Sequence, residues 1–301
     1  MKFKNNKKKI FLLILGISLS LLSTNMGNIN LTEENIDLSE KLNLLKVSEK
    51  IHINNNWSAV KAAGICSGNG TLTNPYLIED LVIDAGHVGS CIFIENSDDY
   101  FMILNCSLTN AENAFDLSEA GIKLWNVSYG SLINNSFIKS NIGMYFYISK
   151  NITLIGNSIT SQHERGIRLV NCDNFYAYLN NIRGTIYDLF IQDSTLRFYS
   201  RKEFNYTYNG RTFTNYIGNY WRAYPGSDED NDGIGDEIHH FEDGVGIDVD
   251  LYPLIAPTEN YDFSTIIIPD IPDGVIPGYD VFLLLGIFSI LSIFIINKRR
   301  K

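Results

Sequence analysis

One apolar pattern is repeated five times in the middle of this 301-residue chain, and the repetition limits the folds that the chain can adopt. Each copy places apolar residues at offsets 0, +2 and +7 and adds a second apolar pair, two residues apart, further along. The triplets are Tyr76/Ile78/Ile83, Phe101/Ile103/Leu108, Gly130/Leu132/Phe137, Ile152/Leu154/Ile159 and Phe175/Ala177/Ile182. The pairs are Ile92/Ile94, Ile122/Leu124, Met144/Phe146, Ile167/Leu169 and Leu189/Ile191. Successive triplets start 25, 29, 22 and 23 residues apart, a period typical of solenoids.

The spacing within each copy predicts strands rather than helices. Residues two apart leave the same face of an extended chain, whereas an amphipathic helix needs apolar residues three and four apart. The runs between Asn, Ser, Asp and Gly are also too short for helices. We therefore predict an all-β chain that forms a right-handed parallel β-helix, a solenoid of about six coils with each coil about 4.8 Å above the last.

Small and amide residues recur where such coils must turn. Asn-Ser and Asn-Asn pairs precede the third apolar position of several copies, and asparagine tolerates the left-handed backbone conformation of tight corners. Gly121, Gly143 and Gly166 precede the second apolar pair, where we expect the chain to turn without a Cβ clash. Residues 109–120 form a longer connection, which predicts a loop pushed out of one coil, and insertions of this kind often build the binding face of a solenoid.

Both termini carry apolar segments that predict export and anchoring. A basic start precedes the apolar run 10–22, which is short for a membrane span and typical of a secretory signal, with an uncleaved anchor as the alternative. Residues 279–296 are almost wholly apolar and end at a basic cluster, which predicts a transmembrane helix with a cytoplasmic tail. A sorting tail cut near Pro277 is the alternative. Either arrangement places the body of the protein at the cell surface.

We expect a single domain with a cap at each end of the coils. An open β-helix end exposes core and unpaired strand edges, and Trp57 with a short helix over 58–63 is the candidate plug at the N-terminal end. The expected order is a signal peptide 1–25, a leader 26–50, an N-terminal cap 51–75, the parallel β-helix 76–217, a calcium-loop cap 218–257, a Pro-rich stalk 258–278, a transmembrane anchor 279–296 and a basic tail 297–301.

Charge and cysteine content limit the partners and the covalent framework. The formal net charge is −10, and nine of the 24 basic residues lie in the two terminal segments, so 15 basic residues face 34 acidic ones elsewhere. We therefore expect no binding to nucleic acid. Eight Asn-x-Ser/Thr sequons predict N-glycosylation, although asparagine-rich turns also create sequons by chance. Among the four cysteines three complete disulfide pairings are open, and buried single thiols are favoured for Cys91 and Cys106.

Two segments are similar to a known family. The first reads G-x-C-S-G-x-G-T-x-x-N-P-Y-x-I-E over 64–79 and continues into I-D-A-G and C-I-F-I-E-N-S. The second reads G-N-Y-W at 218–221, followed by the acidic run 228–236 and Y-P-L at 252–254. Together they bracket about 51–257 and resemble the NosD-like family of right-handed β-helix proteins, which is grouped with carbohydrate-binding proteins and sugar hydrolases. The resemblance implies the fold, and the functions it implies range from copper-centre maturation to surface roles.

The acidic run is the strongest chemical signal in the chain. It follows the calcium-loop pattern D-x-D-x-D-G-x-x-D, in which alternating carboxylates converge on one hard cation and Gly233 permits the sharp bend. Position 12 is His239 rather than a bidentate Glu, so we predict a structural Ca²⁺ site of the extracellular type, with a solvated acidic turn as the alternative. The predicted ligands are Asp228, Asp230, Asp232, Ile234 through its carbonyl, and Asp236, with Asp243, Asp248 and Asp250 as further candidates.

The sequence leaves several functions open. The aromatic-rich stretch 196–216 is interpreted as packing of the last coils, with a platform for sugar rings as the alternative. Cleavage of a polysaccharide would need carboxylates about 5 to 9 Å apart. Copper handling would need soft or imidazole ligands, and the histidines are scattered along the sequence. The weak candidates for a catalytic site are His163, Glu164, Arg165 and Arg168.

We therefore expect a cell-surface β-helix that recognises a polysaccharide, a surface glycan or another surface protein without catalysis. The alternative is a polysaccharide lyase, hydrolase or epimerase acting on the flank of the coils, and a copper-handling accessory is the third hypothesis. Ca²⁺ is the expected cofactor, and the C-terminal helix would provide the contact with the membrane.

Overall fold

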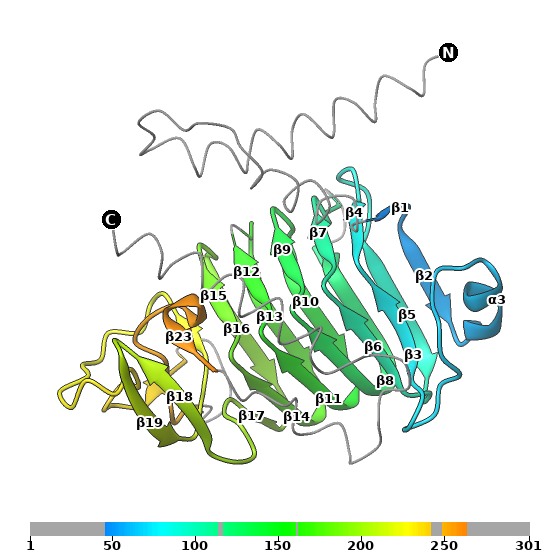
Figure 1. Cartoon of the computed structure of the whole chain (residues 1–301). Helices are drawn as coiled ribbons and strands as arrows, with labels where there is room; N and C mark the ends of the chain where they lie inside the picture. Colours follow the sequence, from blue (N-terminus) through cyan, green and yellow to red (C-terminus); the bar gives the residue numbers. More distant parts are fainter. Residues whose placement is uncertain (1–45, 114–116, 161, 242–248, 264–301) are drawn as a thin grey trace, which may run out of the picture. The chain divides into compact units, whose positions relative to one another are not determined.

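The computed structural model describes residues 46–113, 117–160, 162–241 and 249–263. Parallel strands wind through three faces, which we call sheets A, B and C, and neighbouring coils stack in chain order (Figure 1). The predicted signal peptide 1–25 and transmembrane anchor 279–296 lie outside the described residues. Within the described residues, no helix has the length and apolarity needed to cross a membrane.

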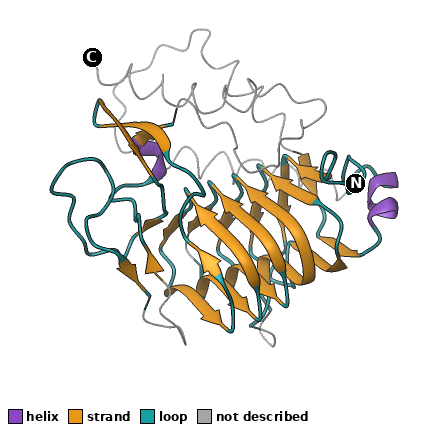
Figure 2. Cartoon of the chain, turned by 90° about the horizontal axis from the view of Figure 1, so that it is seen from below, coloured by secondary structure: helices purple, strands orange, loops and turns teal. Residues whose placement is uncertain are grey.

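The strands of the three sheets come from successive coils and pair in parallel (Figure 2). Sheet A contains β1 (Lys46–Ser48), β4 (Leu81–Asp84), β7 (Ser107–Thr109), β9 (Ser136–Ile138), β12 (Ser158–Thr160), β15 (Asn181–Arg183) and β20 (Tyr220–Trp221). Sheet B contains β2 (Ile51–Asn54), β5 (Ile92–Ser97), the first half of β8 (Ala120–Ile133), β10 (Ile142–Tyr147), β13 (Arg165–Val170) and β16 (Tyr187–Gln192). Sheet C contains β3 (Tyr76–Glu79), β6 (Phe101–Leu104), the second half of β8, β11 (Lys150–Ile155), β14 (Asp173–Tyr178) and β17 (Leu196–Arg197).

The predicted apolar columns are confirmed by the strand register. The first triplet positions pair from Tyr76 through Phe101 to Phe175 on sheet C, and the third positions pair from Ile83 to Ile182 on sheet A. The second apolar pairs align on sheet B. Nearly all of these side chains are buried in one continuous core. The parallel β-helix was therefore predicted correctly, since a period of two fixes which side chains point inward.

The repeated glycines serve a different purpose from the one predicted. Gly121, Gly143 and Gly166 lie inside strands β8, β10 and β13, without the left-handed backbone that a glycine turn would need. A Cβ on Gly143 would lie 2.6 Å from the carbonyl oxygen of Gly166, and one on Gly166 would lie 2.6 Å from that of Asp188. The coils approach too closely at this column for any side chain.

The corners use the left-handed backbone that asparagine accepts. Between sheets B and C, the positions Asn96, Asn126 and Asn171 have φ values of 55°, 53° and 54°. Nδ2 of Asn126 donates to Oδ1 of Asn96 at 3.0 Å, so consecutive exposed corners are joined by side-chain hydrogen bonds. The asparagine-rich turns therefore lie at corners, as the composition of the repeat suggested.

A second set of asparagines is buried where sheet C leads into sheet A. Oδ1 of Asn157 accepts hydrogen bonds from the main-chain nitrogen and Nδ2 of Asn135, at 3.0 and 3.1 Å. Asn180 and Asn219 continue the same pattern toward the C-terminal end. Each amide also donates to a main-chain carbonyl, so this buried asparagine ladder satisfies corner groups that lie outside the strand pairing.

Different elements close the two ends of the solenoid. At the N-terminal end, helix α3 (Trp57–Ala62) buries Trp57, whose ring stacks on Tyr76 at 4.7 Å and whose Nε1 donates to Ser97 at 2.8 Å. At the other end lie the short elements β18 (Phe204–Tyr208), β19 (Arg211–Asn215), β21 (His239–His240), β22 (Val249–Asp250), η1 (Thr258–Asn260) and β23 (Tyr261–Asp262). The coils begin earlier than the predicted boundary at residue 76, because β1 and β2 already pair with β4 and β5.

The four cysteines are free and buried, as favoured for Cys91 and Cys106. Burial raises the pKa of each of these two thiols to about 12. The Sγ of Cys91 lies 3.3 Å from the carbonyl oxygen of Thr109, and the Sγ of Cys106 lies 3.4 Å from that of Leu104. The cysteines therefore act as small core residues.

Candidate functional site

The outer side of sheet B carries a row of aromatic and basic side chains. These residues alternate with the buried core positions of the same strands, so their side chains lie on the opposite face of the sheet. The row crosses six strands in register, with one residue from each: His52, Phe93, Lys123, Tyr145, Arg168 and Phe190.

Within this row each cation lies between two aromatic rings. Nζ of Lys123 lies 5.4 Å from the ring centroid of Phe93 and 6.0 Å from that of Tyr145. Cζ of Arg168 lies 5.0 Å from the Tyr145 centroid and 5.4 Å from that of Phe190. These distances are within the range of cation–π attraction, so the row forms an aromatic–cation ladder along the coils.

More exposed residues border the ladder on both sides. The rings of Trp125 and Tyr147 lie 4.3 Å apart, and Trp125 is 39% exposed. On the other side, Cζ of Arg165 lies 4.8 Å from the centroid of Tyr187, which is 48% exposed. Lys123 and Tyr145 are themselves buried, so contact with a ligand would fall mainly on the partly exposed members. We call the ladder together with Trp125, Tyr147, Arg165 and Tyr187 the sheet B face.

The carboxylates at the border of this face are already paired. Glu119 lies 3.5 Å from Nζ of Lys123 and accepts a hydrogen bond from Ser90 at 2.5 Å. Glu95 contacts Nε2 of His52 at 2.9 Å, and Glu164 lies 3.6 Å from Nε of its neighbour Arg165. The described carboxylates at this border therefore engage neighbouring side chains.

The four candidate catalytic residues separate into two groups. Arg165 and Arg168 lie on the sheet B face, both against the ring of Phe190. His163 instead contacts Glu112 at the corner between sheets A and B. Glu164 follows His163 in the sequence and contacts its other neighbour, Arg165. The sequence held a signal for the rest of the face, because each outward residue of the ladder is the middle residue of an apolar pair, as in Ile92-Phe93-Ile94.

The acidic loop brings three of the predicted ligands together. Carboxylate oxygens of Asp228, Asp230 and Asp232 all lie within 4.8 Å of one another. Main-chain nitrogens of the loop also point at these groups, as Gly233 donates to Asp228 at 3.0 Å. Burial raises the pKa of Asp228, with the neighbouring carboxylates adding to the effect. Asp236 accepts instead from the main-chain nitrogen of Glu229 at 2.6 Å.

Other residues near the acidic run have structural contacts. The side chain of Ile234 is buried in a second apolar cluster, beside Leu254 and Tyr261. Oδ2 of Asp250 is a fully buried acceptor for Nε1 of Trp221 at 2.8 Å and for the nitrogens of Asn219. These bonds assign Asp250 to the asparagine ladder. Two further ligand candidates, Asp243 and Asp248, lie outside the described residues.

The aromatic-rich stretch 196–216 is mostly packing. The strands β18 and β19 form an antiparallel hairpin, and β23 pairs with β18. Phe198, Phe204 and Tyr206 are buried, and Tyr208 stacks on Tyr261 at 4.7 Å. This arrangement agrees with the packing interpretation and leaves the sheet B face as the more exposed aromatic surface.

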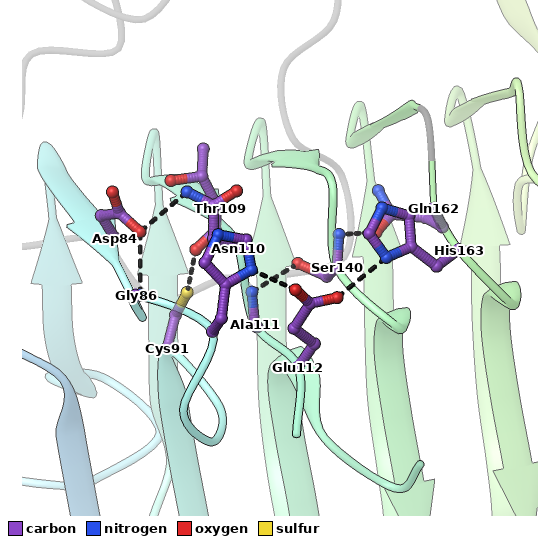
Figure 3. A network of polar contacts seen from close by, with 11 residues as sticks. Asp84, Gly86, Cys91, Thr109, Asn110, Ala111, Glu112, Ser140, Gln162 and His163 are labelled. Atoms are coloured by element: carbon purple, nitrogen blue, oxygen red, sulfur yellow. Dashed lines mark hydrogen bonds and ion pairs between the residues drawn. The ribbon is translucent and has the colours of Figure 1, made fainter. Parts of the chain in front are cut away.

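Two histidines that are far apart in sequence meet at one carboxylate. Nδ1 of His163 lies 2.8 Å from Oε2 of Glu112 (Figure 3), and Nδ1 of His87 contacts Oε1 of the same residue. His87 and His163 are 60% and 52% exposed at their side chains. The sequence spacing of the histidines did not predict this meeting. It joins residues from three different coils.

This corner also tests whether copper fits the chain. The described cysteines and the core methionines Met102 and Met144 are buried and do not present sulfur at the surface. Imidazole and carboxylate donors suit divalent copper. The corner contains two imidazoles, from His87 and His163, and one carboxylate, from Glu112. Among the described residues, however, only Asp228, Asp230 and Asp232 bring three such ligand atoms within 4.8 Å of one another, so the residues at this corner do not fit a copper ion.

A comparison with protein-family models agrees with the fold. A family model described as "Periplasmic copper-binding protein (NosD)" matches residues 21–226. Among solved structures, the crystal structure of the periplasmic alginate epimerase AlgG T265N mutant is similar, with a TM-score of 0.31 and 13% sequence identity. That match covers 41% of this chain and 33% of the epimerase chain, and it assigns no activity to this protein. No curated protein matches the chain.

Proposed function

Because the chain belongs to the NosD family of β-helix proteins, with the match spanning most of the coils, we propose that it is a surface protein whose sheet B face binds a glycan without catalysis. The aromatic–cation ladder is the observation that carries the proposal. Aromatic rings offer apolar faces to sugar rings, and the two arginines Arg165 and Arg168 offer charge to carboxylate or sulfate groups.

The repeat of the coils suits an extended chain as the ligand. Equivalent side chains recur once per strand, about 4.8 Å apart, so the same kind of contact is repeated along the solenoid. The chain as a whole has a net charge of −10, so its overall field repels polyanions. A local row of cations in such a protein favours binding of a specific acidic ligand at that row. An acidic polysaccharide that lies along the sheet B face therefore fits the arrangement best.

The pairing of the carboxylates favours binding over cleavage. Acid/base cleavage of a glycosidic bond needs one carboxyl group to donate a proton and another to accept one or to attack. Glu164 lies 3.6 Å from Nε of Arg165, and Glu119 lies 3.5 Å from Nζ of Lys123. Each of these two carboxylates therefore has a cation beside it, and this pairing supports a binding role for the face.

A calcium ion at the acidic loop is part of the same proposal. Three carboxylates within 4.8 Å of one another repel unless a cation lies between them. Gly233 has φ +91°, and a Cβ there would lie 2.6 Å from the ring of Tyr261, so the loop packs tightly beside the end of the solenoid. Ca²⁺ would stabilise this end of the molecule.

The test compares an acidic polymer with its neutral counterpart. The protein is titrated by calorimetry with polygalacturonate and with the same polymer after reduction of its carboxyl groups. We expect binding of the acidic polymer, and binding at least about tenfold weaker in Trp125→Ala and Arg168→Gln because each removes one contact of the face. The matched control is Arg183→Gln, an arginine on sheet A that pairs with Glu259 at 3.1 Å.

Reducing ends and unsaturated uronates are measured in the same samples. Binding without products, lost in the two sheet B variants and kept in Arg183→Gln, supports the proposal. Products that disappear in Glu164→Gln would instead establish a lyase, hydrolase or epimerase of the kind predicted as the alternative. Equal binding by all variants, or no binding of either polymer, overturns the assignment of the sheet B face.

A further inference from the structure

A cavity lies on the outer side of sheet A, and none of its lining residues belongs to the sheet B face or to the acidic loop. Its volume is about 350 Å³, and it is lined by Thr160, Arg183, Gly184, Tyr220 and Arg222, from the last three strands of the sheet and the residues that follow them. Two arginines line it, although the net charge of the chain is −10. We propose that this cavity binds a small molecule through a phosphate or sulfate group.

The strand register sets the two arginines side by side. Ile182 of β15 pairs with Trp221 of β20, and both side chains are buried in the core. Arg183 and Arg222 follow these two residues, so their side chains point outward from neighbouring coils about 4.8 Å apart. The main-chain nitrogen of Arg222 donates to the carbonyl of Ile182 at 3.0 Å, which extends the pairing to this position. Like charges side by side destabilise a sheet, and an anion bound between them removes the repulsion.

A carboxylate of the chain itself shows which chemical group these donors accept. Oε1 of Glu259 accepts from Nη2 of Arg183 at 3.1 Å, and its Oε2 accepts from Nδ2 of Asn181 at 3.2 Å. This carboxylate satisfies only part of the donor set. Nε of Arg183 is buried without a hydrogen-bond partner among the described residues, and Arg222 forms no ion pair with them. The two arginines therefore carry more donors than the described chain satisfies, as expected of a site that a ligand completes.

The number of donors favours a tetrahedral oxyanion over a carboxylate. A carboxylate has two oxygens, which match the fork of one guanidinium group. A phosphate or sulfate ester has three terminal oxygens and can accept from two guanidinium groups at once. A phosphate ester also carries close to two negative charges at neutral pH, which balances Arg183 and Arg222. Polygalacturonate has only carboxylates, so Arg183→Gln remains the control for the sheet B face.

The other walls of the cavity suit the body of a small polar molecule. Tyr220 contributes a partly exposed aromatic ring, and Thr160 contributes a hydroxyl group. Gly184 has φ +72°, which turns the chain directly after Arg183, and it has no side chain to fill the cavity. The volume of about 350 Å³ lies at the lower end of the range for small-molecule sites. A monosaccharide that carries the anionic group fits these walls, since aromatic rings pack against sugar rings.

The experiment titrates the full-length protein by calorimetry with four monosaccharides. These are galactose 6-phosphate, galactose 6-sulfate, galacturonate and galactose, in a buffer of low ionic strength. We expect one site for an ester, with binding at least about tenfold tighter than that of galacturonate and no measurable binding of galactose. The ester that binds more tightly identifies the group. If neither ester binds, or if galactose binds as tightly as both, the proposal is overturned.

Arginine variants then locate the site. Binding of the ester should weaken at least about tenfold in Arg183→Gln and in Arg222→Gln, because each variant removes one of the two guanidinium groups. Arg211→Gln is the matched control, since Arg211 lies on β19 beside the ring of Phe213 and does not line the cavity. Thermal unfolding of each variant checks that the fold is intact. Unchanged binding in Arg222→Gln, or an equal loss in Arg211→Gln, would mean general charge attraction and overturn the proposal.

Removal of the competing carboxylate gives a test in the opposite direction. Glu259→Gln frees Arg183 from its ion pair, so binding of the ester should tighten at least about threefold. Asp193→Asn changes the net charge by the same amount at a corner outside the cavity and should leave binding unchanged. Equal effects of the two substitutions would contradict a local site. Because the ligands are monosaccharides and the variants lie outside the sheet B face, the result is independent of polymer binding at that face.

Discussion

Oδ2 of Asp250 accepts hydrogen bonds from the main-chain nitrogen and the Nδ2 of Asn219, at 2.9 and 3.2 Å, and so ends the buried asparagine ladder on a carboxylate. In every earlier step of the ladder the acceptor is an amide oxygen of the next asparagine. At this last step no further coil follows to supply one. A carboxylate with two oxygens can also accept from Trp221 and Tyr252, which joins the ladder to the C-terminal segment.

The first prediction concerns the pH dependence of Asp250. Burial raises its pKa to about 6 from the ordinary 3.8, although Trp221, Asn219 and Tyr252 donate to it. Because the folded pKa is raised, the folded state holds the proton more tightly than the unfolded state. The stabilisation is complete below pH 3.8 and is lost as the pH rises through about 6.

Replacement by an amide isolates this effect. Asp250→Asn removes the titration, so its free energy of unfolding relative to the wild type should rise by on the order of 3 kcal/mol between about pH 3.5 and about pH 7. Burial also lowers the pKa of His239 to about 4, which acts in the opposite direction but is common to both proteins. Urea denaturation at several pH values measures the difference, and a difference that does not change with pH contradicts the assignment.

The second prediction concerns the interior of the ladder. Asn157→Ala removes the acceptor of the main-chain nitrogen and Nδ2 of Asn135 and leaves both buried without this partner. We expect a loss of about 2 to 4 kcal/mol in the free energy of unfolding, since the main-chain nitrogen of Asn135 loses its acceptor, Nδ2 keeps only the carbonyl of Ile103, and each lost partner of a buried group costs about 1 to 3 kcal/mol. Asn126→Ala removes an exposed asparagine contact and should cost less than about 1 kcal/mol by the same denaturation measurement. Equal losses would mean that burial of the ladder does not matter.

The third prediction concerns the close approach of the coils. Gly143→Ala places a Cβ where a carbonyl oxygen of the next coil lies 2.6 Å away and a side-chain carbon of Ile159 lies 2.9 Å away. Because backbone must move to relieve this clash, we expect a loss of at least about 2 kcal/mol. Gly210 faces open space with φ +79°, so Gly210→Ala should cost only about 1 kcal/mol of backbone strain. If Gly143→Ala costs no more free energy of unfolding than Gly210→Ala, the spacing between the coils can relax and the prediction is wrong.

The fourth prediction concerns Ca²⁺ at the acidic loop. At a free concentration tenfold above the dissociation constant, a bound ion stabilises the folded state by about 1.4 kcal/mol, and loops of this type bind at about 10⁻⁴ to 10⁻³ M outside cells. Addition of millimolar Ca²⁺ should therefore raise the midpoint of thermal unfolding by a few degrees. The increase should vanish in Asp230→Asn and persist in Asp193→Asn, a corner carboxylate outside the cluster. No increase in the wild type would support the solvated-turn alternative.

The sequence was sufficient for the core because the inward positions obey a strict rule. Every apolar column from Tyr76 to Ile191 could be read from a period of two, since a shift of one residue would turn the whole set outward. The sequence also identified the repeated glycines as constrained positions. It did not predict their role, because the distance between Gly143 and Gly166 depends on how the coils stack.

The surfaces were decided only by the tertiary structure. The apolar pairs fix where each outward residue lies along its strand, but the alternation of Lys123 and Arg168 with aromatic rings depends on register between coils of unequal length. His87 and His163 both contact Glu112, although they lie 25 and 51 residues from it in the sequence. The sequence by itself determined what lies inside this β-helix, because burial of apolar residues is a local and repeated requirement. The stacking of the coils decided which polar groups meet on its outside.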